Sequence, residues 1–219
     1  MKNICAYQRR HGRVSVKQKQ LLRSSPYLLA NRSLSWLDAL PKSSSIICEL
    51  GFGNGERLIN EATNHPQCQF IGIDLYPQGV AQTLHKISQQ QLQNIFILQN
   101  DAQDVLRHLC AKRKFSAIEI FHPDPWPKKR HHKRRLLNNS FIHQCMQRIE
   151  QHGYLRIVTD DPSYQLALLH LLESLPFNLE HKINVPPTTK YGHIAIKEKR
   201  SIQEFTLNHW EISASDLSL

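Results

Sequence analysis

The sequence predicts an α/β fold in which a mostly parallel, twisted sheet carries helices on both faces. Three observations predict it: short apolar runs alternate with helix-like segments from Ser45 onward, the runs are rich in Ile, Leu and Phe, and a glycine-rich turn follows the first run. Strands that are apolar along their whole length are typical of a sheet buried on both faces. Strands that alternate with helices along the chain are typical of parallel pairing.

The expected elements follow in order along the chain. Residues 1–24 predict a basic arm leading into a short helix, and residues 33–40 a second helical piece ended by Pro41. Strands are expected at residues 46–50, 70–74, 95–98, 115–121 and 153–158, with one or two more in the tail, best seen at 201–207. Helices are expected at residues 56–63, from Pro77 onward, and at 102–112, 136–149 and 164–175. We therefore expect a basic N-terminal arm with short helices over residues 1–44 and one further domain over residues 45–219.

Positive charge is concentrated in two blocks. The chain has 28 Lys and Arg against 18 Asp and Glu, a net charge of +10. Residues 1–37 hold eight basic side chains and no acidic one, and residues 128–135 hold six basic side chains and two His, so the remainder is mildly acidic. Such blocks favour nucleic acid, an anionic membrane surface or another acidic partner.

Other features of the sequence exclude some classes of protein. There is no run of 18 apolar residues and no apolar stretch near Met1, so neither a membrane span nor a signal peptide is expected, and we expect a cytoplasmic protein. The five Cys include no Cys-x-x-Cys pair, so we expect reduced thiols and no metal site.

A glycine-rich loop, Glu49-Leu50-Gly51-Phe52-Gly53-Asn54-Gly55, follows the first expected strand. Ligands of open α/β sheets bind at the carboxyl ends of strands, where glycine lets them approach the backbone. A dinucleotide fingerprint would need a further glycine where Glu56 stands, and an acid at Glu49 would oppose a pyrophosphate. That acid suits a cation such as the amino group of S-adenosylmethionine.

Two more acids follow the next strands. Asp74 ends the second strand, where a carboxylate can accept hydrogen bonds from ribose hydroxyls. Asp101 follows the third strand, where it can touch an adenine edge or cap the next helix, and the two roles are compatible. The sequence therefore predicts a nucleoside-type cofactor at this edge of the sheet.

A proline-rich loop and a basic run follow the fourth strand. The prolines of Pro123-Asp124-Pro125-Trp126-Pro127 stiffen the loop and hold Asp124 in place, and the basic run begins at Lys128. Lys and Arg attract phosphates independently of sequence, while Trp126 can stack on a base or pack in the core. This combination indicates a carboxylate held beside a nucleic-acid substrate.

At these motifs the sequence resembles the bacterial tRNA (guanine-N7-)-methyltransferases, which are S-adenosylmethionine-dependent class I enzymes with a Rossmann-like fold. The resemblance covers roughly residues 8–207, and its most specific part is Pro123-Asp124-Pro125-Trp126-x-Lys128-x-Arg130-His131-x-Lys133-Arg134-Arg135. Further matches are Arg9-Arg10-His11-Gly12-Arg13, residues 49–55, Phe70-Ile71-Gly72-Ile73-Asp74, Pro77-x-Gly79-Val80, Thr159-Asp160 and Thr189-Lys190-Tyr191.

The resemblance implies roles for individual residues. It implies a catalytic Asp124, which would also contact the cofactor together with Glu49, Gly51, Gly53, Gly55, Asp74 and Asp101. The substrate nucleotide would be bound by Lys128, Asp160, Thr189, Lys190 and Tyr191. The RNA would face Arg130, His131, Lys133, Arg134 and Arg135. The family's target is a guanosine at position 46 of the tRNA variable loop, so the implied partner is tRNA, and no protein partner is implied.

The sequence departs from the family at two positions. The family usually has Glu and Arg where this chain has Gly192 and Ile194. Gly192 removes a carboxylate from the implied substrate pocket, so either the pocket is completed differently or the activity is altered. A methyltransferase that acts on another RNA or base, and a non-catalytic RNA-binding protein on the same scaffold, remain alternatives, while Glu56 disfavours a dehydrogenase.

Overall fold

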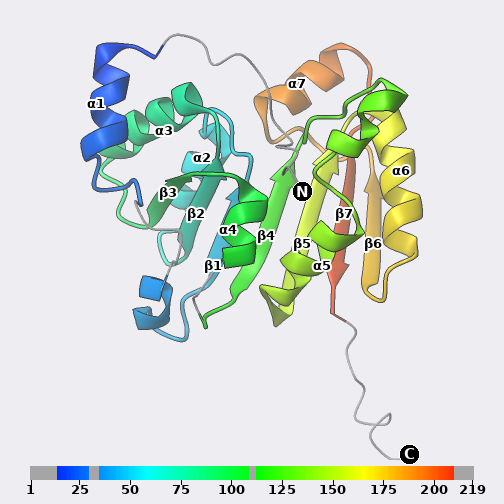
Figure 1. Cartoon of the computed structure of the whole chain (residues 1–219), viewed down its shortest axis with the longest axis horizontal. Coiled ribbons are helices and arrows are strands. Elements are labelled where there is room, and N and C mark those ends of the chain that lie inside the picture. Colours follow the sequence, from blue (N-terminus) through cyan, green and yellow to red (C-terminus); the bar gives the residue numbers. More distant parts are fainter. Residues whose placement is uncertain (1–13, 30–34, 109–111, 210–219) are drawn as a thin grey trace, which may run out of the picture.

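The computed structural model describes residues 14–29, 35–108 and 112–209, which form a seven-stranded sheet with helices on both faces (Figure 1). The strands are β1 (Ile46–Leu50), β2 (Gln69–Asp74), β3 (Ile95–Gln99), β4 (Phe115–Phe121), β5 (Ile149–Thr159), β6 (Asn178–Ile183) and β7 (Gln203–Asn208). Their order in the sheet is β3-β2-β1-β4-β5-β7-β6, and among these strands β7 runs antiparallel to the other six. The predicted mostly parallel α/β fold is confirmed.

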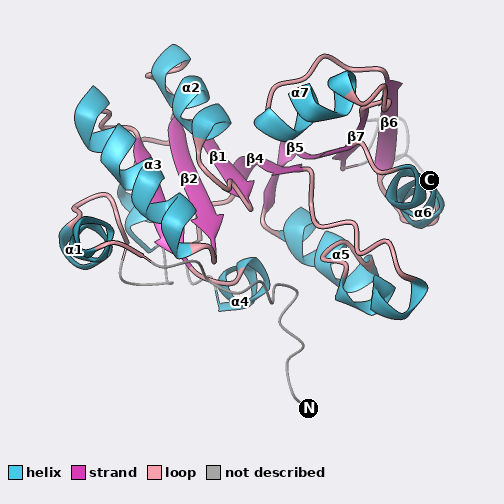
Figure 2. Ribbon diagram, turned by 90° about the horizontal axis from the view of Figure 1, so that it is seen from above, coloured by secondary structure: helices cyan, strands magenta, loops and turns pink. Residues whose placement is uncertain are grey.

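The helices cover the sheet on both sides (Figure 2). They are α1 (Val16–Ser24), α2 (Glu56–Asn64), α3 (Pro77–Gln90), α4 (Ala102–His108), α5 (Asn139–Gln147), α6 (Pro162–Glu173) and α7 (Lys190–Lys197), with 3-10 helices η1 (Ser35–Ala39) and η2 (Lys129–Arg134). One apolar cluster joins α1, α2 and α3 to the sheet, and a larger one joins η1, α4, α5 and α6 to its other face. None of the helices in the described ranges is long and apolar enough to cross a membrane.

The described part of the N-terminal segment is joined to the sheet. Backbone hydrogen bonds of 2.8 Å link Tyr27 and Leu29 to Ile97 on β3. Further on, Asp38 accepts the backbone N–H of Arg113 at 2.7 Å, and the Arg113 guanidinium donates to four carbonyls between Leu40 and Ser44. The division of the chain at residues 44 and 45 stays a prediction, and residues 1–13 of the predicted arm lie outside the described residues.

Some elements differ from the expectation. The helix expected at residues 136–149 begins at Asn139, because the Asn138 side chain accepts the backbone N–H of Phe141 and caps it, and Ile149 already belongs to β5. The expected helix at 102–112 is described to His108. The helices η2 and α7 are not among the expected elements, since their sequences indicate a basic run and a substrate-binding motif.

A row of charged side chains crosses the middle of the sheet, buried at Glu49, Arg57 and Glu119 and partly exposed at Arg156 and Glu204. Glu49 on β1, Glu119 on β4 and Arg156 on β5 are register neighbours. Arg57, in the first turn of α2, donates to Glu49 at 3.0 Å and to Glu119, and Arg156 pairs with Glu119 at 3.2 Å and with Glu204 on β7 at 3.7 Å. Removing one partner from such a buried pair leaves a charge without compensation, which costs roughly 3–5 kcal/mol. The row therefore fixes the start of α2 above the carboxyl ends of β1 and β4.

Helix α3 approaches the glycine-rich loop so closely that only glycine fits at one position. A Cβ atom on Gly79 would lie 2.1 Å from the carbonyl oxygen of Gly53. Because the atom that a Cβ would meet belongs to the backbone of Gly53, no change of side-chain rotamer could relieve the clash.

We expect Gly79→Ala to lower the free energy of unfolding by about 1–3 kcal/mol, because the added methyl group forces α3 away from the loop. Urea unfolding followed by circular dichroism measures this. Ser88→Ala, at an exposed position of the same helix, is the control. Equal unfolding midpoints for the two variants would contradict the expected clash.

The buried row also predicts how stability depends on pH. Burial raises the pKa of Glu49 from 4.5 to about 7; Arg57 opposes the rise, and the charge of Glu119 adds to it. The folded state then holds a proton that the unfolded state has lost, so this residue's contribution to stability falls as pH rises from about 4.5 to about 7.

We therefore expect the stability of Glu49→Gln relative to the wild type to rise with pH across this range, by up to about 1.4 kcal/mol per pH unit. This slope is separate from the cost of removing one partner of Arg57, which lowers the stability of the variant at every pH. Denaturant unfolding at several pH values measures the difference, with the exposed Glu173→Gln as control. A constant difference between Glu49→Gln and the wild type from pH 4.5 to 7 would rule out the raised pKa.

Candidate active site

A cavity of about 600 Å³ opens at the carboxyl ends of the parallel strands. Its volume falls within the range of small-molecule and cofactor sites. The wall is formed by segments that follow β1, β2, β3, β4 and β5, together with Tyr191 from α7 and Arg200 from the turn after it. The cavity therefore lies where open α/β sheets bind their ligands.

The glycine-rich loop forms one side of the cavity with a backbone that suits glycine. Gly51, Gly53 and Gly55 have φ angles of +79°, +61° and +69°, in the left-handed region. Gly51 and Gly53 line the cavity, whereas Gly55 precedes α2 as its N-cap. Without side chains, Gly51 and Gly53 let a ligand contact the backbone.

Asp74 holds this loop in place and also lines the cavity. Its two carboxylate oxygens accept the backbone N–H of Gly53 and of Tyr76, each at 2.7 Å. Burial raises the pKa of Asp74, although these hydrogen bonds oppose the rise. Each oxygen keeps a further lone pair, so the carboxylate can still accept hydrogen bonds from ribose hydroxyls.

Asp101 combines the two roles that the sequence left open. Its Oδ1 accepts the backbone N–H of Gln103 at 2.8 Å and of Asp104 at 3.2 Å, which caps the start of α4, and the residue also lines the cavity. Its neighbour Asn100 lines the cavity too and was not predicted, although its place directly after β3 was a usable signal.

Glu49 lies in the sheet below the cavity wall and not in the wall itself. It is only 3% exposed, its carboxylate is bound by Arg57, and it is not part of the cavity wall. In this structure its contacts are those of the buried row, and the predicted contact with a cofactor stays a prediction.

The proline-rich loop brings Asp124 to the cavity. Asp124 is exposed and lines the wall, and the loop around it contains two non-glycine residues with left-handed backbone, His122 at φ +47° and Trp126 at φ +46°. Such conformations cost energy and persist where the surroundings impose them.

Arg135 is one of the groups that impose this conformation. Its Nε donates to the carbonyl of Pro125 at 2.8 Å, and its guanidinium donates to Ser163 at 2.9 Å and lies over the ring of Tyr164. The side chain is buried, so the contacts it makes in this structure are internal. The RNA contact predicted for Arg135 stays a prediction.

The rest of the basic run forms η2 at the edge of the cavity. Arg134 lies over the Trp126 ring at 4.9 Å and lines the cavity, and the His131 ring meets Trp126 edge-on at 5.8 Å. Desolvation and the charges of Arg134 and its basic neighbours lower the pKa of His131. Lys128, Arg130 and Lys133 are exposed beside the cavity and are not part of its wall.

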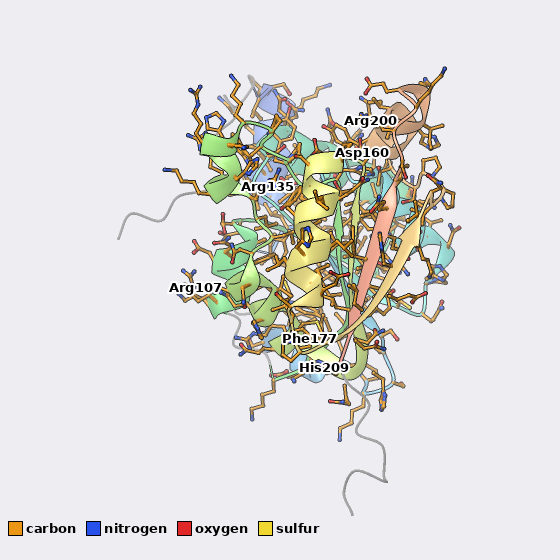
Figure 3. The ribbon with its side chains drawn as sticks, turned by 90° about the vertical axis from the view of Figure 1, so that its right-hand side faces the viewer. Arg107, Arg135, Asp160, Phe177, Arg200 and His209 are labelled. Carbon is orange, nitrogen blue, oxygen red and sulfur yellow. The ribbon has the colours of Figure 1, made fainter. Side chains whose placement is uncertain are left out.

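Asp160, after β5, is bound by two residues that the sequence did not single out. Nδ1 of His122 lies 2.6 Å from Oδ1 of Asp160, and Arg200 pairs with Oδ2, while Glu198 pairs with Arg200 at 2.7 Å. Figure 3 shows Asp160 and Arg200 together at one end of the molecule, away from Phe177 and His209 at the other. Burial would raise the pKa of Asp160, but the hydrogen bond and charge of His122 and the charge of Arg200 outweigh it and lower the pKa.

The Thr189-Lys190-Tyr191 motif begins α7 and divides between two hollows. Thr189 caps the helix by accepting the backbone N–H of Gly192 at 3.0 Å, and Tyr191 lines the cavity with its ring centroid 6.3 Å from that of His122. Thr189 and Lys190 line a neighbouring hollow instead. A Cβ atom on Gly192 would lie 3.4 Å from Nε2 of His122. Gly192, where the resemblance implies a glutamate, therefore lies beside the His122 side chain that binds Asp160.

The structure thus gathers about half of the predicted residues around one cavity. Those in its wall are Gly51, Gly53, Asp74, Asp101, Asp124, Arg134, Asp160 and Tyr191. Those outside it are Glu49, Gly55, Lys128, Arg130, His131, Lys133, Arg135, Thr189 and Lys190. His122 and Arg200 are the main residues that sequence reasoning missed; His122 had a signal, because it joins β4 to the proline-rich loop, whereas Arg200 had none.

Comparisons of the sequence identify relatives. A family model described as "Putative methyltransferase" matches residues 43–211. The chain is 34% identical over 190 residues to the tRNA (guanine-N(7)-)-methyltransferase of Methylobacillus flagellatus, covering 86% of this chain and 77% of that protein. It is 33% identical over 206 residues to the protein of the same name from Acidovorax sp., covering 92% and 82%.

Solved structures share the fold at lower identity. A structure of an antibiotic-related methyltransferase has a TM-score of 0.55 at 16% identity, covering 90% of this chain and 96% of that one. The 16S rRNA (adenine(1408)-N(1))-methyltransferase of Catenulisporales acidiphilia, whose structure contains the cosubstrate SAM, has a TM-score of 0.55 at 11% identity, covering 80% and 88%. The fold is that of the class I Rossmann-like methyltransferases, and the chain belongs to the tRNA (guanine-N7-)-methyltransferase family.

Proposed function

We propose that this protein transfers a methyl group from S-adenosylmethionine to N7 of a guanosine in tRNA, at position 46 of the variable loop, and that it acts in the cytoplasm. The observation that carries the proposal is the meeting, in one cavity, of the glycine-rich loop with Asp74 and Asp101 and the proline-rich loop with Asp124 and Arg134. Membership of the family supports the reaction and the substrate.

The cavity fits the cofactor. Gly51 and Gly53 leave room for a ligand against the backbone, Asp74 can accept hydrogen bonds from ribose hydroxyls, and Asn100 and Asp101 offer polar groups for an adenine edge. Leu75, Ala102 and Ile120 supply apolar wall for the ring. When bound there, S-adenosylmethionine supplies an electrophilic methyl group on a positively charged sulfur.

The proposed methyl transfer does not require a general base. N7 of guanine has an unprotonated lone pair, so no base is needed, and the residues of the cavity must align the base and exclude water. As the bond from N7 to the methyl carbon forms, the bond from that carbon to sulfur would break, so the positive charge would pass from the sulfur to the base and the neutral thioether would leave. A nearby carboxylate would stabilise the charge that develops on the base. Asp124 has this role, because it lines the cavity on a loop fixed by three prolines, Arg135 and the basic helix η2.

Asp160 is suited to recognise the guanine. His122 and Arg200 hold its carboxylate in one orientation, and the lone pairs that they leave can accept hydrogen bonds from the N–H groups of the base. His122 and Arg200 act through Asp160, so we assign them as positioning residues.

One alternative function, methyl transfer to another RNA or base, is supported by a specific residue. Gly192 stands beside His122 where the family has a carboxylate, which favours a methyltransferase that acts on another RNA or base. Incubation with labelled S-adenosylmethionine and unmodified tRNA, followed by digestion and mass spectrometry, identifies the methylated nucleoside. N7-methylguanosine supports the proposal, and any other product, or none, contradicts it.

We expect Asp124→Ala and Asp124→Asn to lower the rate of methyl transfer at least about 100-fold, because the developing charge loses its carboxylate. Binding of tRNA, measured by filter binding, should stay within a few-fold of the wild type. Activity within a few-fold of the wild type would exclude Asp124 as the catalytic carboxylate.

We expect His122→Phe to lower kcat/KM for tRNA about tenfold or more, since a hydrogen bond to a charged group is worth roughly 1.5–3 kcal/mol. Affinity for S-adenosylmethionine, measured by calorimetry, should not change. His122→Asn should recover most of the activity, because Asn keeps an N–H donor and tolerates left-handed backbone. Equal losses in the two variants would show that the hydrogen bond to Asp160 is not what matters.

A further inference from the structure

A second hollow, of about 410 Å³, lies between α2 and α7, which we call the α2–α7 groove. Figure 2 shows both helices on the same side of the sheet. On the α7 side the groove is lined by Lys190, His193, Ile194 and Lys197, spaced three and four residues apart, so one face of the helix forms this wall.

The groove carries uncompensated positive charge. Neither Lys190 nor Lys197 forms an ion pair with a residue in the described ranges. Glu56 is the one acidic side chain among the lining residues, and it lies 3.8 Å from Lys86, which is outside the groove. Arg57 also lines the groove, and its charge is shared by Glu49 and Glu119 in the buried row.

The neutral groups of the groove also suit an anion. Thr188 and Asn60 place hydroxyl and amide donors in its wall. Helix α2 contributes lining residues only from its N-terminal part, so the positive end of its dipole lies at the groove, whereas α7 lines the groove along its whole length. Lysines, neutral donors and helix N-termini together are the groups that bind backbone phosphates.

The position of the groove beside the cavity indicates which phosphates of a nucleic acid it could bind. Tyr191 lines the cavity, while Lys190 and His193, its neighbours on α7, line the groove, so the two hollows share this helix as a wall. The basic residues of η2 lie at the cavity as well, where Arg134 is part of its wall. A nucleotide in the cavity would therefore have basic surfaces from two separate parts of the chain beside it.

We propose that the α2–α7 groove binds backbone phosphates of the tRNA next to the guanosine that enters the cavity. The proposal rests on the proposed function and extends the RNA-binding surface to residues that no sequence motif singles out, above all Lys197 and His193. Binding of this kind depends on released counterions and is sensitive to salt.

The test measures the dissociation constant for tRNA at several salt concentrations for the wild type, Lys197→Gln, and Lys190→Gln with Lys197→Gln together. Removing one lysine–phosphate interaction should reduce the slope of log K against log salt by roughly 0.7–0.9. We expect that reduction for the single variant, about twice that for the double variant, and weaker binding at low salt. Lys114→Gln, at an exposed lysine just before β4 and at the opposite end of the strands, is the matched control.

The groove proposal fails if both groove variants keep the slope of the wild type, or if Lys114→Gln changes it equally. Lys197→Glu serves as a second variant, since reversing the charge should weaken binding more than removing it. Thermal unfolding and calorimetry with S-adenosylmethionine show that the variants are folded and that the cavity is intact. A wild type that binds tRNA with the expected slopes but yields no N7-methylguanosine would overturn the proposed function and leave the groove standing.

Discussion

The structure depends on the buried contact between Arg57 and two glutamates. Its guanidinium binds Glu49 on β1 and Glu119 on β4, and it also lies 3.9 Å from the ring centroid of Phe121, the last residue of β4. The glycine-rich loop follows Glu49 and the proline-rich loop follows Phe121, so both loops of the cavity start from the same buried charge. β1 and β4 are paired in the sheet, and because a buried charge must stay paired, this contact holds the start of α2 against the ends of both strands, where the two loops begin.

The proline-rich loop keeps a strained backbone because groups on both sides of it are fixed. His122 is tied to Asp160 at the start of the loop, and Arg135 holds the carbonyl of Pro125 near its end. The left-handed residues at positions 122 and 126 are thus imposed from β5 and from the segment after η2. A loop held in this way places Asp124 without a further loss of entropy when the substrate binds.

The sequence predicted features that depend on neighbouring residues. The strands, the glycine-rich turn and the acids that follow β2 and β3 could be predicted because an apolar run and the residue after it determine them locally. Contacts between distant segments could not be predicted in this way. His122 and Asp160 are 38 residues apart in the sequence, and Arg200, which pairs with Asp160, comes from the C-terminal part of the chain. The ion pair of Glu49 with Arg57 is a further contact that the sequence did not predict, while the cofactor contact expected for Glu49 stays a prediction.

Gly192, where the resemblance to the family implies a glutamate, lies close to the cluster formed by His122, Asp160 and Arg200. A Cβ atom on Gly192 would already lie 3.0 Å from Pro187, so little room is left beside His122. After α7, Lys199 has a φ of +57° and the backbone N–H of Arg200 donates to Ala195 at 2.8 Å, which directs Arg200 to Asp160. Arg200 places a positive charge beside Asp160, and position 192 has no carboxylate. Asp160 therefore supplies the carboxylate beside His122 that can accept hydrogen bonds from the N–H groups of guanine. In the proposed reaction, recognition of guanine at this wall therefore rests on Asp160, whose orientation His122 and Arg200 determine.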